Sequence, residues 1–336
     1  MERPQSRRPE QPSPPGRGKR WAGWLFALCT ASLALATEPT RAGAQRSIET
    51  PLTAGDQLLF FYDARLGRVP FLSIANSSPS DVTVSIAFYP TDLASRLATE
   101  VLTIPARASR VVDPTLVAGG VIVGNAGLAV VTPVVGPSNQ TPVVPPEPLL
   151  GGFTLANVTL GSAFGEAALG RYAVMLHGVR AQVGRVVDGK LVRFQQIAPH
   201  RLAVPVYFNP VQLAPPELDG NRVILAVFSD RWTKVTAGPE TGTIRFDVVA
   251  ATDRPLVYFS DAAGAPLIAR RIDVSGVLVT NLQELSGDPS LLVGSGKVLI
   301  DVAAGQDNII GLFSQSLGTF ASGQRMPALP ARERIP

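Results

Sequence analysis

Side chains able to do acid–base, nucleophilic or metal chemistry are scarce in this sequence. It contains two histidines, His177 and His200, and one cysteine, Cys29. A two-histidine zinc spacing is therefore missing, and a thiolate cluster cannot be built. His177 lies in the apolar run Val174–Val179, where a hydrogen-bonded imidazole at a strand end is commoner than a catalytic base. We expect no metal and no cofactor.

Two glycine-framed segments resemble catalytic or phosphate-binding motifs without matching them. Gly161–Gly165 places its serine second, whereas a nucleophile elbow places it third. Gly294–Lys297 lacks the earlier glycine and the following Ser or Thr of a phosphate-binding loop, so we predict a hairpin loop there. We predict no catalytic residue and no enzyme. A hydrolase with an unmarked carboxylate site ranks third among the functions, because sequence spacing cannot show two carboxylates facing across a cleft.

One aromatic residue is a candidate for ligand binding. Sandwich modules that hold glycans use exposed aromatic rings as stacking platforms. Trp232 lies between Asp230-Arg231 and Thr233-Lys234, a polar setting that predicts a loop. A loop tryptophan that covers its own core is the competing interpretation. The tyrosines of apolar runs are expected in the core: Tyr62, Tyr89, Tyr207 and Tyr258.

The beginning of the sequence reads as an export signal. A basic start that ends at Arg20 runs into the apolar segment Trp21–Ala36, and small residues typical of a cleavage site follow at Ala34–Ala36 and Ala42–Ala44. The apolar segment is shorter than the roughly 20 residues that a membrane-spanning helix needs. We therefore predict a cleaved signal peptide over residues 1–44, and an exported protein that is extracellular, periplasmic or on the cell surface.

Removal of this leader changes the charge balance. The whole chain has 30 Lys and Arg against 26 Asp and Glu, and seven of the bases but three of the acids lie in the first 44 residues. The remainder is neutral, which argues against a nucleic-acid partner. Cys29 leaves with the leader, so a mature chain relies on its buried core, for which the 46% hydrophobic content suffices. No later apolar run is long enough to span a membrane.

The periodicity of the remaining sequence is that of β-strands. Short runs of Val, Ile, Leu and Phe are bounded by turn-forming residues. They include Gln57–Tyr62, Phe71–Ala75, Val82–Phe88, Val223–Phe228, Thr243–Val249 and Lys297–Val302. Large apolar residues alternate in Val82–Phe88, as in an antiparallel strand with one buried face. We predict an all-β fold of antiparallel sheets.

Turn and helix signals complete this prediction. Asp188-Gly189 predicts a two-residue turn for a hairpin over residues 182–195. Short helices or turns are expected in Thr91–Glu100 and Val277–Leu285. Because long helices are missing between the strands, a sandwich is favoured over a parallel α/β architecture.

An internal repeat organises the strands. Leu58–Asp63 is echoed by Val204–Asn209, and Leu150–Thr154 by Ile310–Ser314, in the same order and about 150 residues apart, a domain-sized offset. The repeat predicts two tandem β-sandwich domains with separate cores. Domain 1 covers residues 45–199, including the hairpin at 182–195, which either completes this domain or bridges to the next. Domain 2 covers 200–328, and a disordered tail covers 329–336.

This layout is similar in general terms to immunoglobulin-like and fibronectin-III-like sandwiches. The resemblance concerns architecture and brings no functional residues with it. We therefore expect an exported, non-enzymatic protein with a structural or interaction role at the cell envelope or surface, with a protein or an envelope polysaccharide as partner. The alternative is a secreted carbohydrate-binding module.

Overall fold

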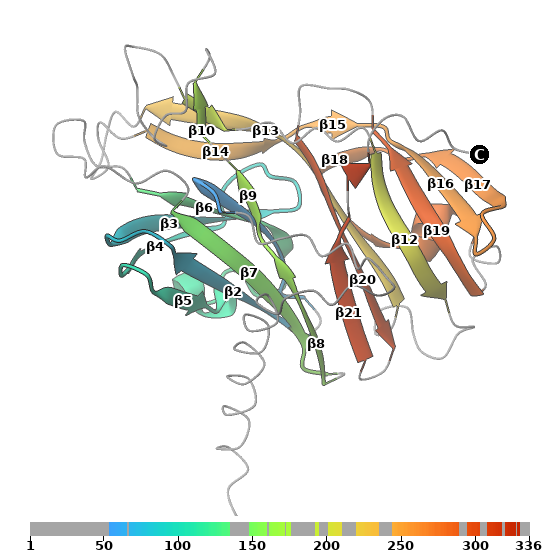
Figure 1. Ribbon diagram of the computed structural model, residues 1–336, viewed down its shortest axis with the longest axis horizontal. Helices are drawn as coiled ribbons and strands as arrows, with labels where there is room; N and C mark the ends of the chain where they lie inside the picture. The colour runs from blue at the N-terminus through green and yellow to red at the C-terminus, as the bar shows by residue number, and fades with distance from the viewer. Residues whose placement is uncertain are drawn as a thin grey trace, which may run out of the picture. The chain divides into compact units, whose positions relative to one another are not determined.

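The structure of the chain is a computed structural model. It describes residues 54–65, 67–134, 148–159, 161–171, 173–175, 192–194, 201–209, 220–234, 244–288, 294–302, 308–317, 320–326 and 328–329. Antiparallel β-strands make up most of these residues (Figure 1). The all-β prediction is confirmed.

The first nine strands, which we call the N-terminal set, form two sheets. One has the order β4-β3-β6-β1-β9 and the other the order β5-β2-β7-β8. The strands are β1 (Gln57–Asp63), β2 (Arg68–Asn76), β3 (Val82–Pro90), β4 (Ala98–Ile104), β5 (Ser109–Val112), β6 (Ala126–Pro133), β7 (Leu149–Asn157), β8 (Ser162–Ala167) and β9 (Leu169–Arg171).

The C-terminal set also forms two sheets. One has the order β17-β16-β19-β12-β22 and the other the order β15-β18-β13-β20-β21, with β14 paired to β13. The strands are β12 (Arg201–Asn209), β13 (Gly220–Lys234), β14 (Ile244–Ala250), β15 (Thr252–Asp253), β16 (Leu256–Asp261), β17 (Pro266–Arg271), β18 (Val274–Asn281), β19 (Gly294–Asp301), β20 (Asn308–Leu317), β21 (Phe320–Arg325) and β22 (Ala328–Leu329).

The two sets have the same connectivity. If β14 and β15 are treated as an insertion, the successive strands of the C-terminal set occupy the positions of β1 to β9 in order. A short helix also recurs between corresponding strands: the 3₁₀ helix η1 (Pro114–Gly119) follows β5, and α2 (Leu282–Ser286) follows β18. Both helices begin with a side-chain cap, supplied by Asp113 in the first and Asn281 in the second.

Hydrogen bonds repeat along with the order. Gly151 of β7 lies opposite Ile74, and Gly311 of β20 lies opposite Leu225. The backbone N–H of Ala168 donates to the Gly151 carbonyl at 2.9 Å, and that of Met326 donates to the Gly311 carbonyl at 2.9 Å. In both sets this bond lies where the chain passes from one sheet to the other. The sequence pairing of Leu150–Thr154 with Ile310–Ser314 therefore agrees with the strand register.

For the first strands of the two sets, strand pairing gives a correspondence of residues one position away from the sequence alignment. Tyr62 of β1 lies opposite Gly127, and Tyr207 of β12 lies opposite Gly296. The two tyrosines therefore correspond, whereas the alignment of Leu58–Asp63 with Val204–Asn209 matches Tyr207 to Phe61. β12 also contains an irregularity of register between Val204 and Tyr207. On the other side of it Val204 corresponds to Phe60, so the sequence alignment is displaced by two residues there.

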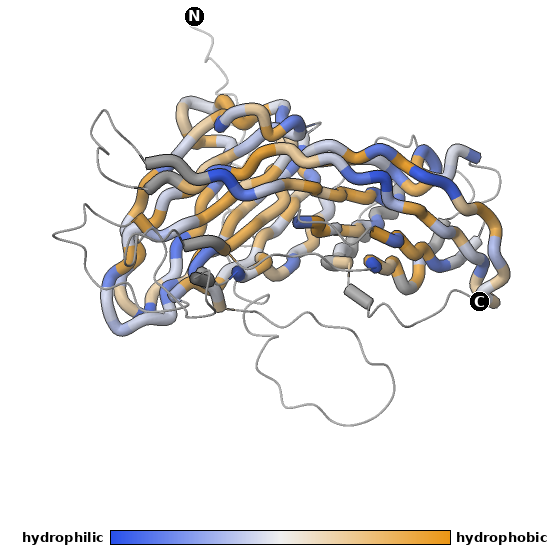
Figure 2. Tube along the Cα trace, turned by 90° about the horizontal axis from the view of Figure 1, so that it is seen from above, coloured by the Kyte–Doolittle hydropathy of each residue, from blue (hydrophilic) through white to orange (hydrophobic). Residues whose placement is uncertain are grey.

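The apolar side chains gather in two core clusters. The first contains side chains of β1, β2, β3, β6 and β7, with Phe60 and Phe153 in edge contact at 6.4 Å between ring centroids. The second lies between the two sheets of the C-terminal set and contains Tyr207, Phe259 and Phe313. Figure 2 shows the hydrophobic residues concentrated along the strands.

Strand β13 contributes to both clusters. Val223, Leu225 and Val227 belong to the second cluster, and the alternate residues Ile224, Ala226 and Phe228 belong to the first. Because neighbouring side chains of a strand point to opposite faces, both faces of β13 are buried. The expectation of two separate cores is therefore corrected: the first cluster includes side chains from both sets.

Ion pairs lie at both ends of this shared face. Arg222 of β13 donates to Asp63 of β1 at 2.7 Å, and Arg171 of β9 donates to Asp230 of β13 at 2.7 Å. Asp63 also pairs with Arg65 at 3.0 Å, and Arg68 lies 3.8 Å away. The side chains of Asp63 and Arg171 are fully buried. These ion pairs connect the two strand sets at either end of the apolar face of β13.

Several local predictions are settled by the strand bounds. The six apolar runs named above coincide with strands, except that Val302 follows the end of β19 and Thr243 lies outside the described residues. Residues Val277–Asn281 continue β18, so the second predicted helix is wrong over its first half and begins only at Leu282. Gly294–Lys297 opens β19 and is no hairpin loop, because it pairs with β12 and β16.

The remaining predictions concern residues that lie partly outside the described part of the chain. The predicted signal peptide, residues 1–44, lies outside them, and so do the Asp188-Gly189 turn, His177, His200 and residues 330–336. Within the hairpin region, β10 (Ala173–Met175) pairs with β11 (Val192–Phe194). Leu329, the first residue of the predicted tail, lies in β22. In the described part of the chain, no helix is long and apolar enough to cross a membrane.

Candidate functional site

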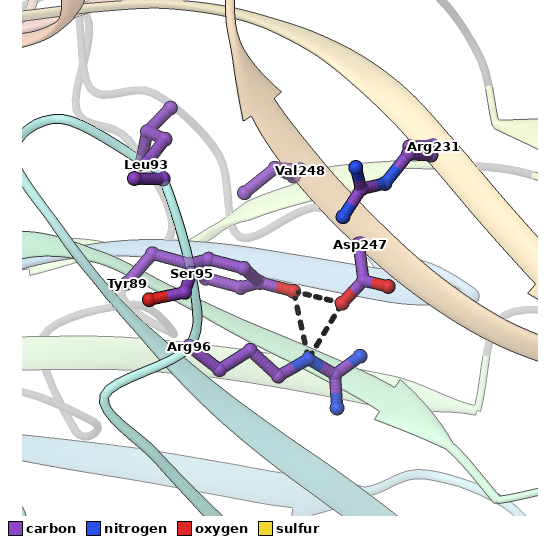
Figure 3. A pocket seen from close by; sticks show the side chains of 8 residues that line it. Tyr89, Leu93, Ser95, Arg96, Arg231, Asp247 and Val248 are labelled. Carbon is purple, nitrogen blue, oxygen red and sulfur yellow. Dashed lines mark hydrogen bonds and ion pairs between the residues drawn. The ribbon is translucent and has the colours of Figure 1, made fainter.

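A small cavity lies where the turn after β3 meets β13 and β14. Its volume is about 220 Å³. Tyr89, Leu93, Ser95 and Arg96 line it from one side (Figure 3). Arg231, Asp247 and Val248 line it from the other. We call it the Tyr89 cavity, and it joins residues of both strand sets.

The turn after β3 is held by backbone hydrogen bonds. The N–H of Leu93 donates to the Pro90 carbonyl at 3.1 Å, and that of Leu97 donates to the Phe88 carbonyl at 2.8 Å. Leu93 has a φ of 50°, a left-handed conformation that costs energy for a non-glycine residue. Its side chain is nevertheless buried in the first core cluster. The turn is thus anchored by Leu93, which leaves Ser95 exposed and Arg96 half-buried.

The turn is also bound to the C-terminal set. The N–H of Val277 in β18 donates to the Thr91 carbonyl at 2.7 Å. Gly276 lies so close that a Cβ there would collide with the same carbonyl. This backbone contact holds the two walls of the Tyr89 cavity in place.

Three polar side chains meet at the centre of the cavity. The Tyr89 hydroxyl donates to Asp247 Oδ1 at 2.9 Å. Arg96 Nε donates to the Tyr89 hydroxyl at 3.0 Å and to Asp247 Oδ1 at 2.6 Å (Figure 3). Arg96 Nη2 donates to the Phe246 carbonyl at 2.6 Å. The hydrogen bonds form a closed triangle, so the phenol donates one bond and accepts one.

The electrostatics keep the phenol protonated. Burial raises the pKa of Tyr89 well above its ordinary value; the nearby Arg96 lowers that pKa, and Asp247 raises it. A phenol held neutral in this way donates and accepts hydrogen bonds, and it is a poor general base or nucleophile. The triangle therefore positions the turn against β14.

Arg231 and Ser95 differ from these three residues. Arg231 lies directly opposite Asp247 in the β13–β14 pair, and its side chain is exposed. Among the described residues, neither Arg231 nor Ser95 forms a side-chain hydrogen bond or ion pair. A guanidinium and a hydroxyl are thus available to a molecule that enters the cavity.

The candidate from the sequence, Trp232, has a different setting from the one expected. It lies within strand β13, opposite Phe246, so the prediction of a loop is wrong. The reason is that β13 extends past its apolar part to pair with β14 through polar residues. The orientation of the indole lies outside the described part of the structure, and Trp232 adjoins Arg231 in sequence.

The tyrosines expected in the core are mostly there. Tyr62, Tyr89 and Tyr207 are buried. Tyr258 is half-buried, in a strand whose neighbouring residues Val257 and Phe259 point into the second cluster. Among the described residues, no group of three or more His, Cys, Asp or Glu side chains could hold a metal ion.

Sequence reasoning named Tyr89 but missed its partners. Arg96 and Asp247 are 151 residues apart, and no local pattern connects them. Only an alignment of the two halves could have shown that β14 and β15 are additional to the repeat. This insertion is the segment that carries Asp247 and pairs with Arg231.

Comparison with known proteins identifies no family for the chain. No protein-family profile and no curated protein sequence matches it. Two solved structures were found, both of the lectin from Pleurotus ostreatus, one in complex with GalNAc and one in the apo form. The first is 11% identical with a TM-score of 0.12, covering 82% of this chain and 83% of the lectin chain. The second is 9% identical with a TM-score of 0.11, covering 83% and 82%. Similarity at this level carries no argument about fold or function.

Proposed function

We propose that the protein is an exported, non-enzymatic β-sandwich protein that acts through binding, as a structural or interaction component of the cell envelope or surface. The observation that carries this proposal is the Tyr89 cavity. Its central hydrogen bonds are satisfied within the protein, while Arg231 and Ser95 are available to a bound molecule. This arrangement supports a role in binding.

The proposal includes two tandem sandwiches of the immunoglobulin or fibronectin-III type, with their boundary at residues 199/200. The repeated strand order and the matching bonds at Gly151 and Gly311 support it. So does the position of the boundary, which falls between β11 and β12. The buried face of β13 then acts as the interface between the two sandwiches.

Export is proposed from the sequence of residues 1–44. The basic start, the apolar segment and the small-residue cleavage patterns support a cleaved leader. The mature chain is then expected to begin after Ala44, or after Ala36 as the second choice.

A secreted carbohydrate-binding module is the second candidate function. The volume of about 220 Å³ favours it, because this space is below the roughly 300 Å³ at which drug-sized ligand sites begin and suits one sugar unit. A hydrolase with two carboxylates is supported less well, since the cavity lining contains one carboxylate, that of Asp247.

Fractionation of the native host with N-terminal sequencing tests the proposal. We expect the protein in the secreted, periplasmic or surface fraction, beginning at residue 45 or 37. Affinity capture from the same fraction should retain an envelope protein or polysaccharide. Recovery of the intact chain, residues 1–44 included, from the cytoplasm would contradict the proposal.

A further inference from the structure

The charge of the Tyr89 cavity is unbalanced. Its charged side chains are Arg96, Arg231 and Asp247, and Asp247 is paired to Arg96 at 2.6 Å. The guanidinium of Arg231 has no acidic partner among the described residues. The cavity therefore carries one excess positive charge, which favours an anionic ligand.

The guanidinium of Arg231 favours a particular class of anionic ligand. A guanidinium presents parallel N–H donors whose geometry matches the two oxygens of a carboxylate. Arg231 is held by the β13–β14 pairing, so its backbone position is fixed while its side chain remains accessible. A carboxylate above Arg231 would form a bidentate pair and displace no hydrogen bond or ion pair to the described residues.

A second wall offers a partner for a hydroxyl group. Ser95 supplies an exposed hydroxyl that can donate and accept (Figure 3). A sugar presents hydroxyls at the edge of its ring. An acidic peptide side chain offers the carboxylate without the ring hydroxyls.

We propose that the Tyr89 cavity binds one hexuronate unit of an acidic polysaccharide. The carboxylate would pair with Arg231 and a ring hydroxyl with Ser95. Tyr89, Arg96 and Asp247 serve as positioning residues that hold the turn and β14 in register. This inference rests on the proposed interaction role and names the chemical class of its ligand.

Isothermal titration of the full chain with galacturonate and glucuronate oligosaccharides tests the inference. Neutral galactose and glucose oligosaccharides of equal length serve as ligand controls. We expect binding of the acidic sugars only, weakening as salt concentration rises. The substitution Arg231→Gln should weaken binding at least tenfold, and Ser95→Ala at least threefold.

Arg110→Gln is the matched control variant. Arg110 is likewise an exposed arginine without a described partner, but it lies on β5, away from the cavity. It should leave uronate affinity unchanged. Because Arg231 and Ser95 make no side-chain hydrogen bonds or ion pairs with the described residues, their variants should melt at the temperature of the unaltered chain, which separates lost binding from lost folding.

Three results would overturn the inference. They are equal binding of neutral sugars, equal effects of Arg231→Gln and Arg110→Gln, and binding of a polyglutamate peptide in place of the uronates. The proposed function fails separately: a cytoplasmic location would contradict it even if uronates bind, and an envelope location without uronate binding overturns only this inference.

Discussion

Arg171 of β9 and Asp230 of β13 form an ion pair of 2.7 Å in which the arginine side chain is fully buried. The guanidinium carbon lies 5.0 Å from the centroid of the Phe194 ring and 5.7 Å from that of Phe228. Arg171 Nε also donates to Gln57 Oε1 at 2.9 Å. Burial lowers the pKa of Arg171, and the charge of Asp230 opposes this shift. Asp230 therefore compensates a charge that would otherwise be buried without a counterion.

The substitution Asp230→Asn should strongly destabilise the fold. It removes the counter-charge and leaves the buried guanidinium, at a cost of about 3–5 kcal/mol in the free energy of unfolding. Urea denaturation followed by circular dichroism measures this change. Asp273→Asn is the control, because it breaks the ion pair to Arg254, whose partners are 71% and 68% exposed. Equal effects of the two substitutions would contradict the structural role of Arg171.

The arginines around Asp63 predict an asymmetric mutational effect. Asp63→Asn leaves Arg65, Arg68 and Arg222 without their shared carboxylate, whereas Arg222→Gln leaves the other two paired with it. We expect Asp63→Asn to lower the free energy of unfolding by at least about 1 kcal/mol more than Arg222→Gln. A double-mutant cycle should give a coupling of about 1–3 kcal/mol between the two residues. A coupling near zero would contradict the conclusion that this ion pair stabilises the contact between the two strand sets.

Two glycines at corresponding positions should be intolerant of alanine. A Cβ at Gly127 would collide with the Tyr89 carbonyl, and one at Gly296 with the Ser260 carbonyl. Gly127→Ala and Gly296→Ala should each lower the melting temperature well below that of Gly152→Ala, whose nearest contact would be 3.2 Å. Melting followed by circular dichroism compares the three. If Gly152→Ala were the most damaging, the tight pairing of β6 and β19 with their neighbours would be wrong.

Alkaline solution should destabilise the fold through its buried tyrosines. Burial raises the pKa of both Tyr62 and Tyr89 above the ordinary value of 10.0. Above pH 10 the unfolded chain loses these phenolic protons while the folded chain keeps them, so the free energy of unfolding falls as pH rises. Below pH 10 both states are protonated, and this contribution is fully present.

Absorbance of tyrosinate near 295 nm, with denaturation at pH 9 to 12, measures the effect. We expect Tyr89→Phe to have a shallower decline above pH 10 than the unaltered chain. It should also be less stable at neutral pH by about 1–2 kcal/mol, because the hydroxyl bridges Arg96 and Asp247. An unchanged slope would show that Tyr89 ionises normally in the folded chain.

Strands with local signals could be predicted, and long-range polar pairs could not. The apolar runs from Gln57 to Val302 coincide with strands because alternation and bounding turns are properties of a few neighbouring residues. Tyr89 and Asp247 are 158 residues apart, so their contact depends on how the two strand sets pack. The burial of β13 by both strand sets could not be predicted for the same reason. Its continuous apolar run Val223–Phe228 predicts a buried strand but not which residues cover each face.

The two buried faces of β13 set an order of events during synthesis. The N-terminal set leaves the ribosome first, before β13 exists to cover it. Until then, Leu59 and Phe61, which share the first cluster with Ile224 and Phe228, lack those neighbours, and Asp63 lacks Arg222. Apolar side chains of the N-terminal set therefore reach their final degree of burial only after β13 has been made.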